Sequence, residues 1–493
     1  MSNILGISAG FHDAAVSIID NNGDILFAGH SERYSKIKND HDISHGLLEE
    51  IKGYGYDHIA YYEVPWRRRL RGIFSGEGLK GDWSIDPILK KHLRDVYDPR
   101  IPKSCHRHHL SHAAAGFQTS PFNDAVVIVI DAIGELDTIS IYDAYYDSRG
   151  IARYKKLWSQ SYPHSIGLFY SAITKRVGLK PLDEEYITMG MAAWGKPTAL
   201  FDMYDYAIDD LTGIKFERNF HIGIDEYVFA QYSNEDIACA AQKITTNLIN
   251  QVKRKARELS KSENLVYMGG VALNCMANSC LTGLFSNTWI MPNPGDAGSS
   301  LGAAALVYGK KLQWKDAFLG YNIEGEYPVD GLIKELLSKQ IVGVANGRAE
   351  FGPRALGNRS LLADPRGPDI KDRVNEIKRR QKFRPFAPVI LEEYVHDYFK
   401  MPFGWDTSPY MQIVAVCKDP QLFPAIVHVD DTSRVQTVSR DGSGIRKLLE
   451  EWHAQTGCPM LLNTSLNIRG EPMVNDLNDA RRFEETYGVR VLS

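Results

Sequence analysis

The chain has 493 residues, of which 44% are hydrophobic and 24% are charged. This length predicts at least two domains, and the composition is that of an ordinary soluble protein. A formal net charge of -4 at pH 7 excludes a general attraction to nucleic acid or anionic membranes, so any such partner must be bound locally.

The first part of the chain alternates apolar runs with turns. The runs "ILGISAG" and "AAVSIIDNNGDILFAG" predict short strands with a hairpin turn at Asn22-Gly23. The pattern returns at "DAVVIVIDAIGELDTISIYDA", where a β-branched run reaches Asp131, turns at Gly134 and resumes. Two strand-turn-strand units of this kind predict an internal duplication.

Helical patterns follow, and they alternate with further strands. "SIGLFYSAITKRVGL" and "DIACAAQKITTNLINQVKRKARELS" have the apolar spacing of amphipathic helices, whereas "NLVYMGGVALNCMANS" and "WIMPNPGDAGSSLGAAALVYG" predict a strand, a glycine turn and a helix start. This alternation predicts an α/β fold. The polar stretch "YNIEGEYPVDG" predicts a linker between a first domain, residues 1–330, and a second α/β domain, residues 335–493.

No targeting segment or membrane span is expected. The opening "MSNILGISAG" lacks a basic region followed by a long apolar run, and no window holds about 18 uninterrupted apolar residues. The six cysteines form no C-x-x-C pair, which favours reduced thiols over a disulfide framework or a structural zinc site. We therefore expect a cytoplasmic protein.

Four histidines lie in the seven residues "HRHHLSH", which begin at residue 106. His108 and His112 are four residues apart, so on a helix both imidazoles reach one cation, although a capping or surface role is the alternative. Asp131 and Asp296 each end an apolar run close to glycine, where ligands gather at strand ends. A turn or an N-cap is the alternative for both aspartates.

Two other motifs resemble known catalytic signatures but lack their context. "GISAG" matches the nucleophile elbow around Ser8, yet a hairpin follows it where the elbow requires a helix. "GMAAWGKPT" imitates a phosphate loop, but Pro197 replaces the hydroxyl that holds magnesium, and a helix that ends at Gly195 is favoured instead.

Small residues and clustered cations mark candidate binding segments. "GGVALN" and "PGDAGSSLGAAA" let backbone amides approach a phosphate or nucleoside, and close helix packing is the alternative; together they indicate a nucleotide. Eight of the Lys and Arg residues between positions 348 and 384 of the second domain predict an anion pocket or a solvated face. They are Arg348, Arg354, Arg359, Lys378, Arg379, Arg380, Lys382 and Arg384.

A further basic cluster, "WRRRLRG", is either a solvated loop or a contact to phosphates; its arginines are Arg67, Arg68, Arg69 and Arg71.

Taken together, these residues resemble the O-carbamoyltransferase family of nodulation-factor and antibiotic biosynthesis. The matching segments occur in family order over nearly the whole chain: "GISAGFHDAAVSI", "SERYSKIKND", "HHLSHAA", "DAIGE", "YPHSIGLFYSA", "MGMAAWGKP", "GGVALN", "NPGDAGSSLGAA", "GRAEFGPRALGNRS", "FRPFAPVI", "DDTSRVQTV" and "LLNTSLNIRGEP". The resemblance implies a duplicated, actin-like ATPase-type N-terminal domain for carbamoyl transfer. It also implies a C-terminal domain that resembles the double-stranded-RNA-binding-like fold and forms carbamoyladenylate.

The resemblance also assigns residue roles. It implies a metal site, usually for Fe2+, at His108, His112, Asp131 and Asp296, with His12 as general base on the acceptor hydroxyl. An unperturbed imidazole, whose pKa is about 6.5, suits that role near neutral pH. Nucleotide binding is assigned to Gly269, Gly270, Asn274, Gly295 and Gly298. Carbamoyl phosphate and ATP are assigned to Lys38, Arg354, Lys378, Arg384, Arg434, Asn463 and Ser465, although the family often reads "EERF" where this chain has "SERYSKIK".

The implied activity is an ATP-dependent O-carbamoyltransferase. It would make carbamoyladenylate from carbamoyl phosphate and ATP, with Mg2+ as a further candidate ion, and pass the carbamoyl group to a hydroxyl of a small molecule or nucleoside. The alternatives are 5-hydroxymethylcytosine in DNA as the acceptor, for which the arginines of "WRRRLRG" are candidate contacts, and a tRNA threonylcarbamoyl-type transferase. An actin-like regulatory ATPase without transferase activity is a third alternative. Formation of a homodimer is a separate expectation that the sequence leaves open.

Overall fold

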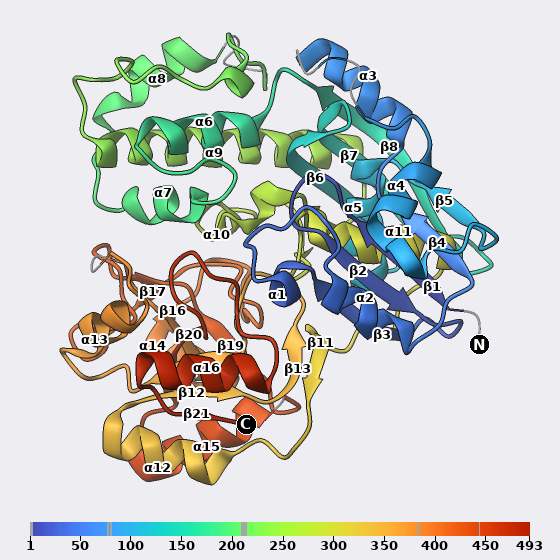
Figure 1. The fold of residues 1–493 in the computed structure, drawn as a ribbon. Helices are drawn as coiled ribbons and strands as arrows, with labels where there is room; N and C mark the ends of the chain where they lie inside the picture. The colour runs from blue at the N-terminus through green and yellow to red at the C-terminus, as the bar shows by residue number, and fades with distance from the viewer. Residues whose placement is uncertain (1–2, 76–77, 79–80, 209–213, 382–383, 443) are drawn as a thin grey trace. The chain divides into compact units, whose positions relative to one another are not determined.

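The computed structural model describes residues 3–75, 78, 81–208, 214–381, 384–442 and 444–493. The chain divides into two compact units (Figure 1). Unit 1 comprises Met1–Ser31 and Asn39–Lys315, and unit 2 comprises Glu32–Lys38 and Asp316–Ser493. The stretch "YNIEGEYPVDG", expected to be a linker, lies inside unit 2, where β11 (Phe318–Ile323) pairs with β13 (Gly347–Glu350).

Unit 1 contains two five-stranded sheets with the same topology. The first has the order β3-β2-β1-β4-β5 and the second β8-β7-β6-β9-β10, so the strands correspond one to one. In both sheets the first three strands in sequence are antiparallel neighbours and the last two are parallel to the first. The bounds are β1 Ile4–Ser8, β2 Ala15–Ile19, β3 Ile25–His30, β4 His58–Tyr61, β5 Lys103–Cys105, β6 Asp124–Gly134, β7 Asp137–Tyr146, β8 Ala152–Ser161, β9 Asn264–Met268 and β10 Asn287–Trp289. The expected duplicated, actin-like arrangement is confirmed by this topology.

Two helices pack between the sheets of unit 1. Helix α5 (His108–Thr119) contacts β6 and β9, and α11 (Ser299–Tyr308) contacts β1 and β2 (Figure 1). The helices meet through small residues: a Cβ on Gly302 of α11 would lie 1.8 Å from the carbonyl oxygen of Ser111 in α5. Only glycine permits this approach, so the Ala- and Gly-rich composition of α11 serves close packing.

The other helices of unit 1 include both amphipathic helices expected from the sequence. These are α6 (Ile166–Arg176), capped by Ser165, and α9 (Asn234–Leu259), capped by Ser233. Helix α7 (Glu185–Met191) ends earlier than expected, since a turn precedes Gly195. The remaining helices are α2 His45–Lys52, α3 Pro65–Ser75, α4 Ile85–Leu93, α8 Leu200–Ala207 and α10 Cys275–Asn278.

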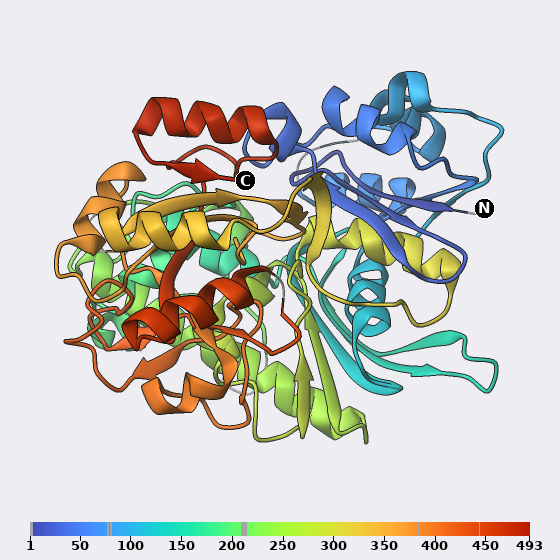
Figure 2. The same cartoon turned by 90° about the horizontal axis from the view of Figure 1, so that it is seen from below.

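Unit 2 is an α/β unit built on a six-stranded sheet in the order β19-β15-β20-β14-β12-β21. Helices α12 (Val329–Lys339) and α15 (Gly444–Thr456) lie side by side against this sheet (Figure 2). The strands are β12 Ile341–Ala345, β14 Arg359–Ala363, β15 Ala387–Leu391, β19 Gln436–Val438, β20 Met460–Ser465 and β21 Val491–Leu492, and a small sheet holds β16 Phe399–Lys400, β17 Ala415–Cys417 and β18 Thr432–Ser433. The other helices are α1 Glu32–Ser35, α13 Ile370–Ile377, α14 Val395–Tyr398 and α16 Leu477–Tyr487.

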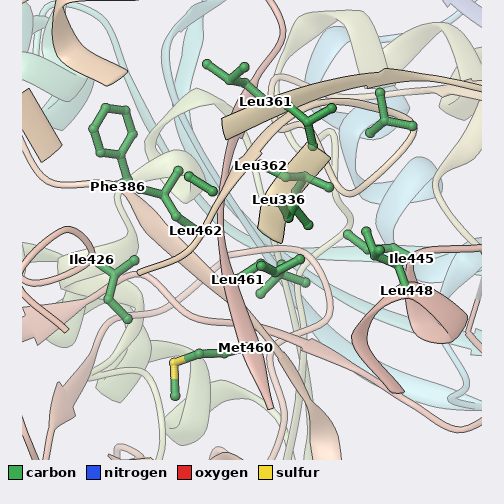
Figure 3. Close-up of a cluster of buried hydrophobic side chains, with 14 of the residues drawn as sticks. Leu336, Leu361, Leu362, Phe386, Ile426, Ile445, Leu448, Met460, Leu461 and Leu462 are labelled. Carbon is green, nitrogen blue, oxygen red and sulfur yellow. The ribbon is translucent and has the colours of Figure 1, made fainter. Parts of the chain in front are cut away.

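The sheet and these helices both contribute side chains to the core of unit 2. Leu461 and Leu462 of β20 are fully buried and belong to the same apolar cluster as Leu336, Ile445 and Leu448 of the two helices (Figure 3). No helix among the described residues is both long and apolar enough to cross a bilayer.

Candidate active site

Two histidines and two aspartates converge at one point in unit 1. The Nε2 atoms of His108 and His112 lie 3.0 Å apart. Oδ2 of Asp131 is 3.1 Å from each of these nitrogens, and Oδ1 of Asp296 is 3.3 Å from that of His108 and 3.2 Å from that of His112. All four side chains are buried, and their candidate ligand atoms lie within 4.8 Å of one another. The structure thus brings together the four residues expected to hold a metal ion.

The fold explains this convergence. His108 and His112 are one turn apart on α5 and therefore share a face of the helix. Asp131 lies near the carboxyl end of β6, and Asp296 follows β10, which is linked to β6 through β9 by parallel pairing. The carboxyl ends of parallel strands meet at one edge of a sheet, and this agrees with the strand-end positions expected for both aspartates.

The hydrogen bonds of the imidazoles orient their lone pairs toward the centre of the cluster. Nδ1 of His112 donates to the carbonyl oxygen of Pro294 at 3.0 Å, and Nδ1 of His108 donates to Oε1 of Glu63 at 2.9 Å. In the neutral rings both Nε2 lone pairs then face each other and the two carboxylates. A cation between them satisfies all four groups, and a set of two imidazoles and two carboxylates suits a divalent transition metal.

The electrostatics of the cluster agree with a cation site. Burial raises the pKa of Asp131 and Asp296, but the two imidazoles outweigh it and hold both pKa values below the ordinary range. Conversely, burial lowers the pKa of His108 and His112, while the carboxylates outweigh it and raise both values. The two buried negative charges therefore attract positive charge to this point.

His12 lies at the edge of the cluster. Its Nε2 is 3.8 Å from Oδ2 of Asp296, and its Nδ1 is 3.0 Å from Oδ2 of Asp13. Burial lowers the pKa of His12, but the hydrogen bond to Asp13 and the charges of Asp296 and Asp131 outweigh it and raise the pKa to about 9. The expectation of an unperturbed imidazole is therefore wrong for the protein alone, because sequence spacing does not show how many carboxylates surround a side chain.

Two buried glutamates behind the cluster were missed by sequence reasoning. Glu63, two residues beyond β4, binds His108 and also accepts a hydrogen bond from Nη1 of Arg68 at 3.3 Å. Nη2 of Arg68 donates at 2.6 Å to the carbonyl oxygen of Gly10, two residues before His12. Arg68 thus connects the residue that orients a candidate metal ligand with the loop that carries the candidate base.

The second glutamate explains the basic stretch "WRRRLRG". Nε of Arg67 donates to Glu135 at 2.8 Å, and the backbone N–H of Val64 donates to the same carboxylate at 2.7 Å. The guanidinium of Arg69 lies 4.6 Å from the ring centroid of Trp83. These arginines make contacts within unit 1, which disfavours their interpretation as contacts to DNA; the side chain of Arg71 lies outside the described residues.

The glycines assigned to nucleotide binding divide into two kinds. A Cβ on Gly269 would lie 2.1 Å from the carbonyl oxygen of Ile130, and one on Gly298 would lie 1.9 Å from that of Asn293. These two glycines permit close backbone packing. Gly270 instead lies beside the candidate metal site, since its Cβ would be 3.1 Å from Oδ1 of Asp131, and Gly295 has open space at the Cβ position.

Asn274 caps the short helix α10. Its side-chain oxygen accepts from the N–H of Ala277 at 3.1 Å and from Nε2 of Gln242, also at 3.1 Å, while its Nδ2 donates to Gln242 at 3.0 Å. The side chain is therefore engaged within the protein.

Two of the residues assigned to carbamoyl phosphate and ATP lie on β20 of unit 2, and a third, Lys378, contacts that strand. Asn463 and Ser465 are two residues apart on β20, so their side chains share a face. Nζ of the buried Lys378 lies 2.5 Å from the carbonyl oxygen and 3.3 Å from Oγ of Ser465. Burial, followed by the charges of Arg380 and Arg384, lowers the pKa of Lys378, which places Arg384 in the same electrostatic environment.

The other assigned residues are less closely gathered. Nδ2 of Asn463 donates to the carbonyl oxygen of Ala355, the neighbour of Arg354, at 3.1 Å. Arg434 is half-buried two residues before β19, whose Gln436 also binds Asn463. Lys38 ends the Glu32–Lys38 segment, which belongs to unit 2. Lys382, one of the clustered cations, lies outside the described residues.

Comparison with known proteins identifies the family. The family models for the carbamoyltransferase N-terminus and C-terminus match residues 83–305 and 333–493. An uncharacterized protein of Synechocystis is 33% identical, with 98% of this chain and 94% of the relative covered. Nodulation protein NolO of Bradyrhizobium diazoefficiens is 32% identical over 76% of this chain and 75% of its own length.

Solved structures are more distant. The activator of the 2-hydroxyisocaproyl-CoA dehydratase of Clostridium difficile is 14% identical, covers 62% of this chain and 94% of its own, and has a TM-score of 0.34. Full-length HypF is 13% identical with a TM-score of 0.36, over 62% of this chain and 55% of its own. These scores add nothing to the topology described above. The two family matches and the two relatives carry the assignment: the chain belongs to the carbamoyltransferase family and is a carbamoyl-transferring enzyme.

Proposed function

We propose that this protein is an ATP-dependent O-carbamoyltransferase that forms carbamoyladenylate in unit 2 and uses it at the His12 site of unit 1. The observation that carries the proposal is the buried cluster of His108, His112, Asp131 and Asp296 with His12 beside it, in a chain of the carbamoyltransferase family. Two buried carboxylates that would hold a cation, next to a candidate base, suit transfer of a carbamoyl group from an anionic donor to a hydroxyl.

The first step activates the carbamoyl group. Water attacks the phosphorus of carbamoyl phosphate, the mixed-anhydride bond from phosphorus to the carbamoyl oxygen breaks, and carbamate and phosphate result. A carbamate oxygen then attacks the α-phosphorus of ATP, the bond to the β-phosphate breaks, and pyrophosphate leaves. In unit 2, the guanidiniums of Arg354, Arg384 and Arg434 and the ammonium of Lys378 offset the phosphate charges and orient the reactants. ATP is expected to enter with Mg2+.

The second step transfers the group. The acceptor oxygen attacks the carbamoyl carbon, the bond from that carbon to the adenylate oxygen breaks, and AMP leaves with the bonding electrons. His12 takes the hydroxyl proton on its free nitrogen. A divalent cation held by the four ligands would supply positive charge for the adenylate phosphate and offset the aspartate charges that raise the pKa of His12. Gly295, with open space at its Cβ position, is a candidate backbone contact to the nucleotide, and burial would protect the mixed anhydride from water.

The metal is tested by elemental analysis of the purified protein. We expect about one equivalent of a divalent transition metal, with Fe2+ favoured by the resemblance and Zn2+ or Mn2+ also suited to the ligands. A His108→Ala, His112→Ala double variant is expected to lose it. Equal metal content in both proteins would refute the site.

The acceptor is tested by mass spectrometry of hydroxylated compounds incubated with carbamoyl phosphate and ATP. We expect the net addition of HNCO to a small-molecule or nucleoside hydroxyl. DNA that contains 5-hydroxymethylcytosine is the second acceptor to include, although the internal contacts of Arg67 and Arg68 do not favour it. A tRNA threonylcarbamoyl-type activity would instead consume threonine, and its detection would replace the present proposal.

A further inference from the structure

Side chains from distant parts of unit 2 hold the backbone of the segment that carries Arg354. We call residues 352–357, "GPRALG", the Arg354 loop. One carboxylate oxygen of Glu350 accepts from the N–H groups of Leu356 at 2.8 Å, Asn358 at 3.0 Å and Arg359 at 3.2 Å. The carboxylate therefore fixes the end of the loop and the start of β14.

Four carbonyl groups of the loop are bound as well. Arg33 donates to that of Gly352 at 2.8 Å, Asn463 to that of Ala355 at 3.1 Å, Gln436 to that of Leu356 at 2.9 Å and Tyr327 to that of Gly357 at 2.8 Å. The donors come from α1, β20, β19 and the approach to α12. An irregular loop whose backbone groups are bound by side chains in this way has little freedom to move.

Arg33 is the most distant of these residues in sequence, at 319 positions from Gly352. It is 3% exposed; burial lowers the pKa of its guanidinium, and the charge of Glu350 opposes this effect most strongly. The segment around it is docked independently, because Lys36 forms an ion pair with Asp479 at the start of α16 and also donates to the carbonyl oxygen of Arg33 at 2.6 Å. A buried guanidinium has a high desolvation cost, which a purely structural surface segment would avoid.

We propose that Arg33 and Glu350 are positioning residues that fix the Arg354 loop so that the Arg354 guanidinium meets its anion in one orientation. The inference rests on the proposed function, in which Arg354 binds carbamoyl phosphate or ATP. Through Arg33, the Glu32–Lys38 segment then contributes to the geometry of the adenylate-forming site in unit 2. It also changes the role of Asn463, whose buried amide holds the loop carbonyl of Ala355 and so acts on the site through the loop.

The mechanism of the effect is geometric. A bidentate guanidinium contact to a phosphate or carboxylate depends on the plane of the group, which the loop backbone sets. Displacements near 1 Å at such a contact reduce rates by about 10²-fold. Loss of the Arg33 contact frees one end of the loop while four other side chains still hold it, so we expect a fall of about tenfold in kcat/KM for carbamoyl phosphate.

The test is a double-mutant cycle in the full-length protein, with carbamoyl-phosphate-dependent pyrophosphate release as the assay. The single variants are Arg33→Gln and Arg354→Ala, and the third protein combines them. If Arg33 acts through Arg354, the double variant is no slower than Arg354→Ala alone. If Arg33 only supports folding, the two losses multiply, and that result would overturn the inference.

Controls separate this inference from the proposed function. Lys36→Met removes the docking ion pair and the hydrogen bond to the backbone carbonyl of Arg33 but leaves the bond from the Arg33 side chain to the loop, and it is expected to keep kcat/KM within about twofold of the wild type. Wild-type activity in Arg354→Ala would refute the role of Arg354 in the proposed function itself. If Arg33→Gln does not fold, Arg33→Lys, which keeps a buried positive charge near Glu350, replaces it in the cycle with the same two outcomes.

Discussion

Replacement of Glu63 by Gln isolates the electrostatic support that this carboxylate gives to the candidate metal site. Glu63 is buried, and its Oε1 accepts the Nδ1 proton of His108 at 2.9 Å. Gln retains an acceptor oxygen, so the imidazole keeps its orientation while the negative charge is lost. A carboxylate partner makes an imidazole a stronger ligand, and loss of such partners costs about 10- to 100-fold in metal affinity.

The structure places the expected loss at the lower end of this range. Arg68, 3.3 Å from Glu63, already offsets part of the carboxylate charge, as does the hydrogen bond from His108; together they outweigh burial and hold the pKa of Glu63 below its usual value. We therefore expect a loss of about tenfold in affinity, which corresponds to about 1.4 kcal/mol. Competition between the protein and a chromophoric chelator for Zn2+ or Mn2+ measures this loss of metal affinity.

Glu135→Gln is the matched control. Glu135 is also buried and also binds an arginine, Arg67, but within the described residues it makes no hydrogen bond to His108 or His112 and acts on His108 only through space. Its variant is expected to bind the metal with nearly wild-type affinity. Equal affinity losses in Glu63→Gln and Glu135→Gln would show that the effect is general to buried charge in this region and would refute the reasoning.

Four further variants test other parts of the structure. His12→Asn is expected to slow acceptor carbamoylation by about 10²-fold or more while carbamoyl-phosphate-dependent pyrophosphate release persists, and loss of both would contradict a role confined to transfer. Leu462→Ala, in the core of unit 2, is expected to lower the free energy of unfolding by about 2–5 kcal/mol, measured by denaturant titration; an unchanged midpoint would contradict its central position. Arg67→Ala and Arg68→Ala are expected to lower thermal stability without altering retention of DNA at low salt, because both side chains bind buried glutamates. Salt-sensitive DNA binding that either change abolishes would restore the DNA interpretation.

The sequence predicts the metal ligands better than their surroundings. The spacing of His108 and His112 and the strand-end positions of Asp131 and Asp296 follow from local patterns, and family resemblance selected these four among the alternatives. Glu63 has the same strand-end position after β4, so that rule applied to every parallel strand would have found it. Its partner Arg68 was attributed to solvent or nucleic acid, because a run of arginines does not reveal which carboxylates face it.

Contacts between segments that are far apart in the chain could not be predicted from local sequence patterns. The Glu32–Lys38 segment has a polar sequence that fits an ordinary connection, and nothing near it indicates that Arg33 binds a loop 319 positions away. The helix expected to reach Gly195 ends at Met191, and Gly195 instead serves packing against the start of α9, because a Cβ on it would lie 2.0 Å from the carbonyl oxygen of Glu235. Both cases depend on contacts between segments that are separate in sequence.

The central claim is tested most directly by the products that the purified protein forms from carbamoyl phosphate, ATP and a hydroxylated acceptor. The proposed reaction releases one phosphate, one pyrophosphate and one AMP for each carbamoyl group transferred, and omission of carbamoyl phosphate stops pyrophosphate release. Formation of ADP in place of AMP, or carbamoylation of the acceptor without ATP, would contradict it.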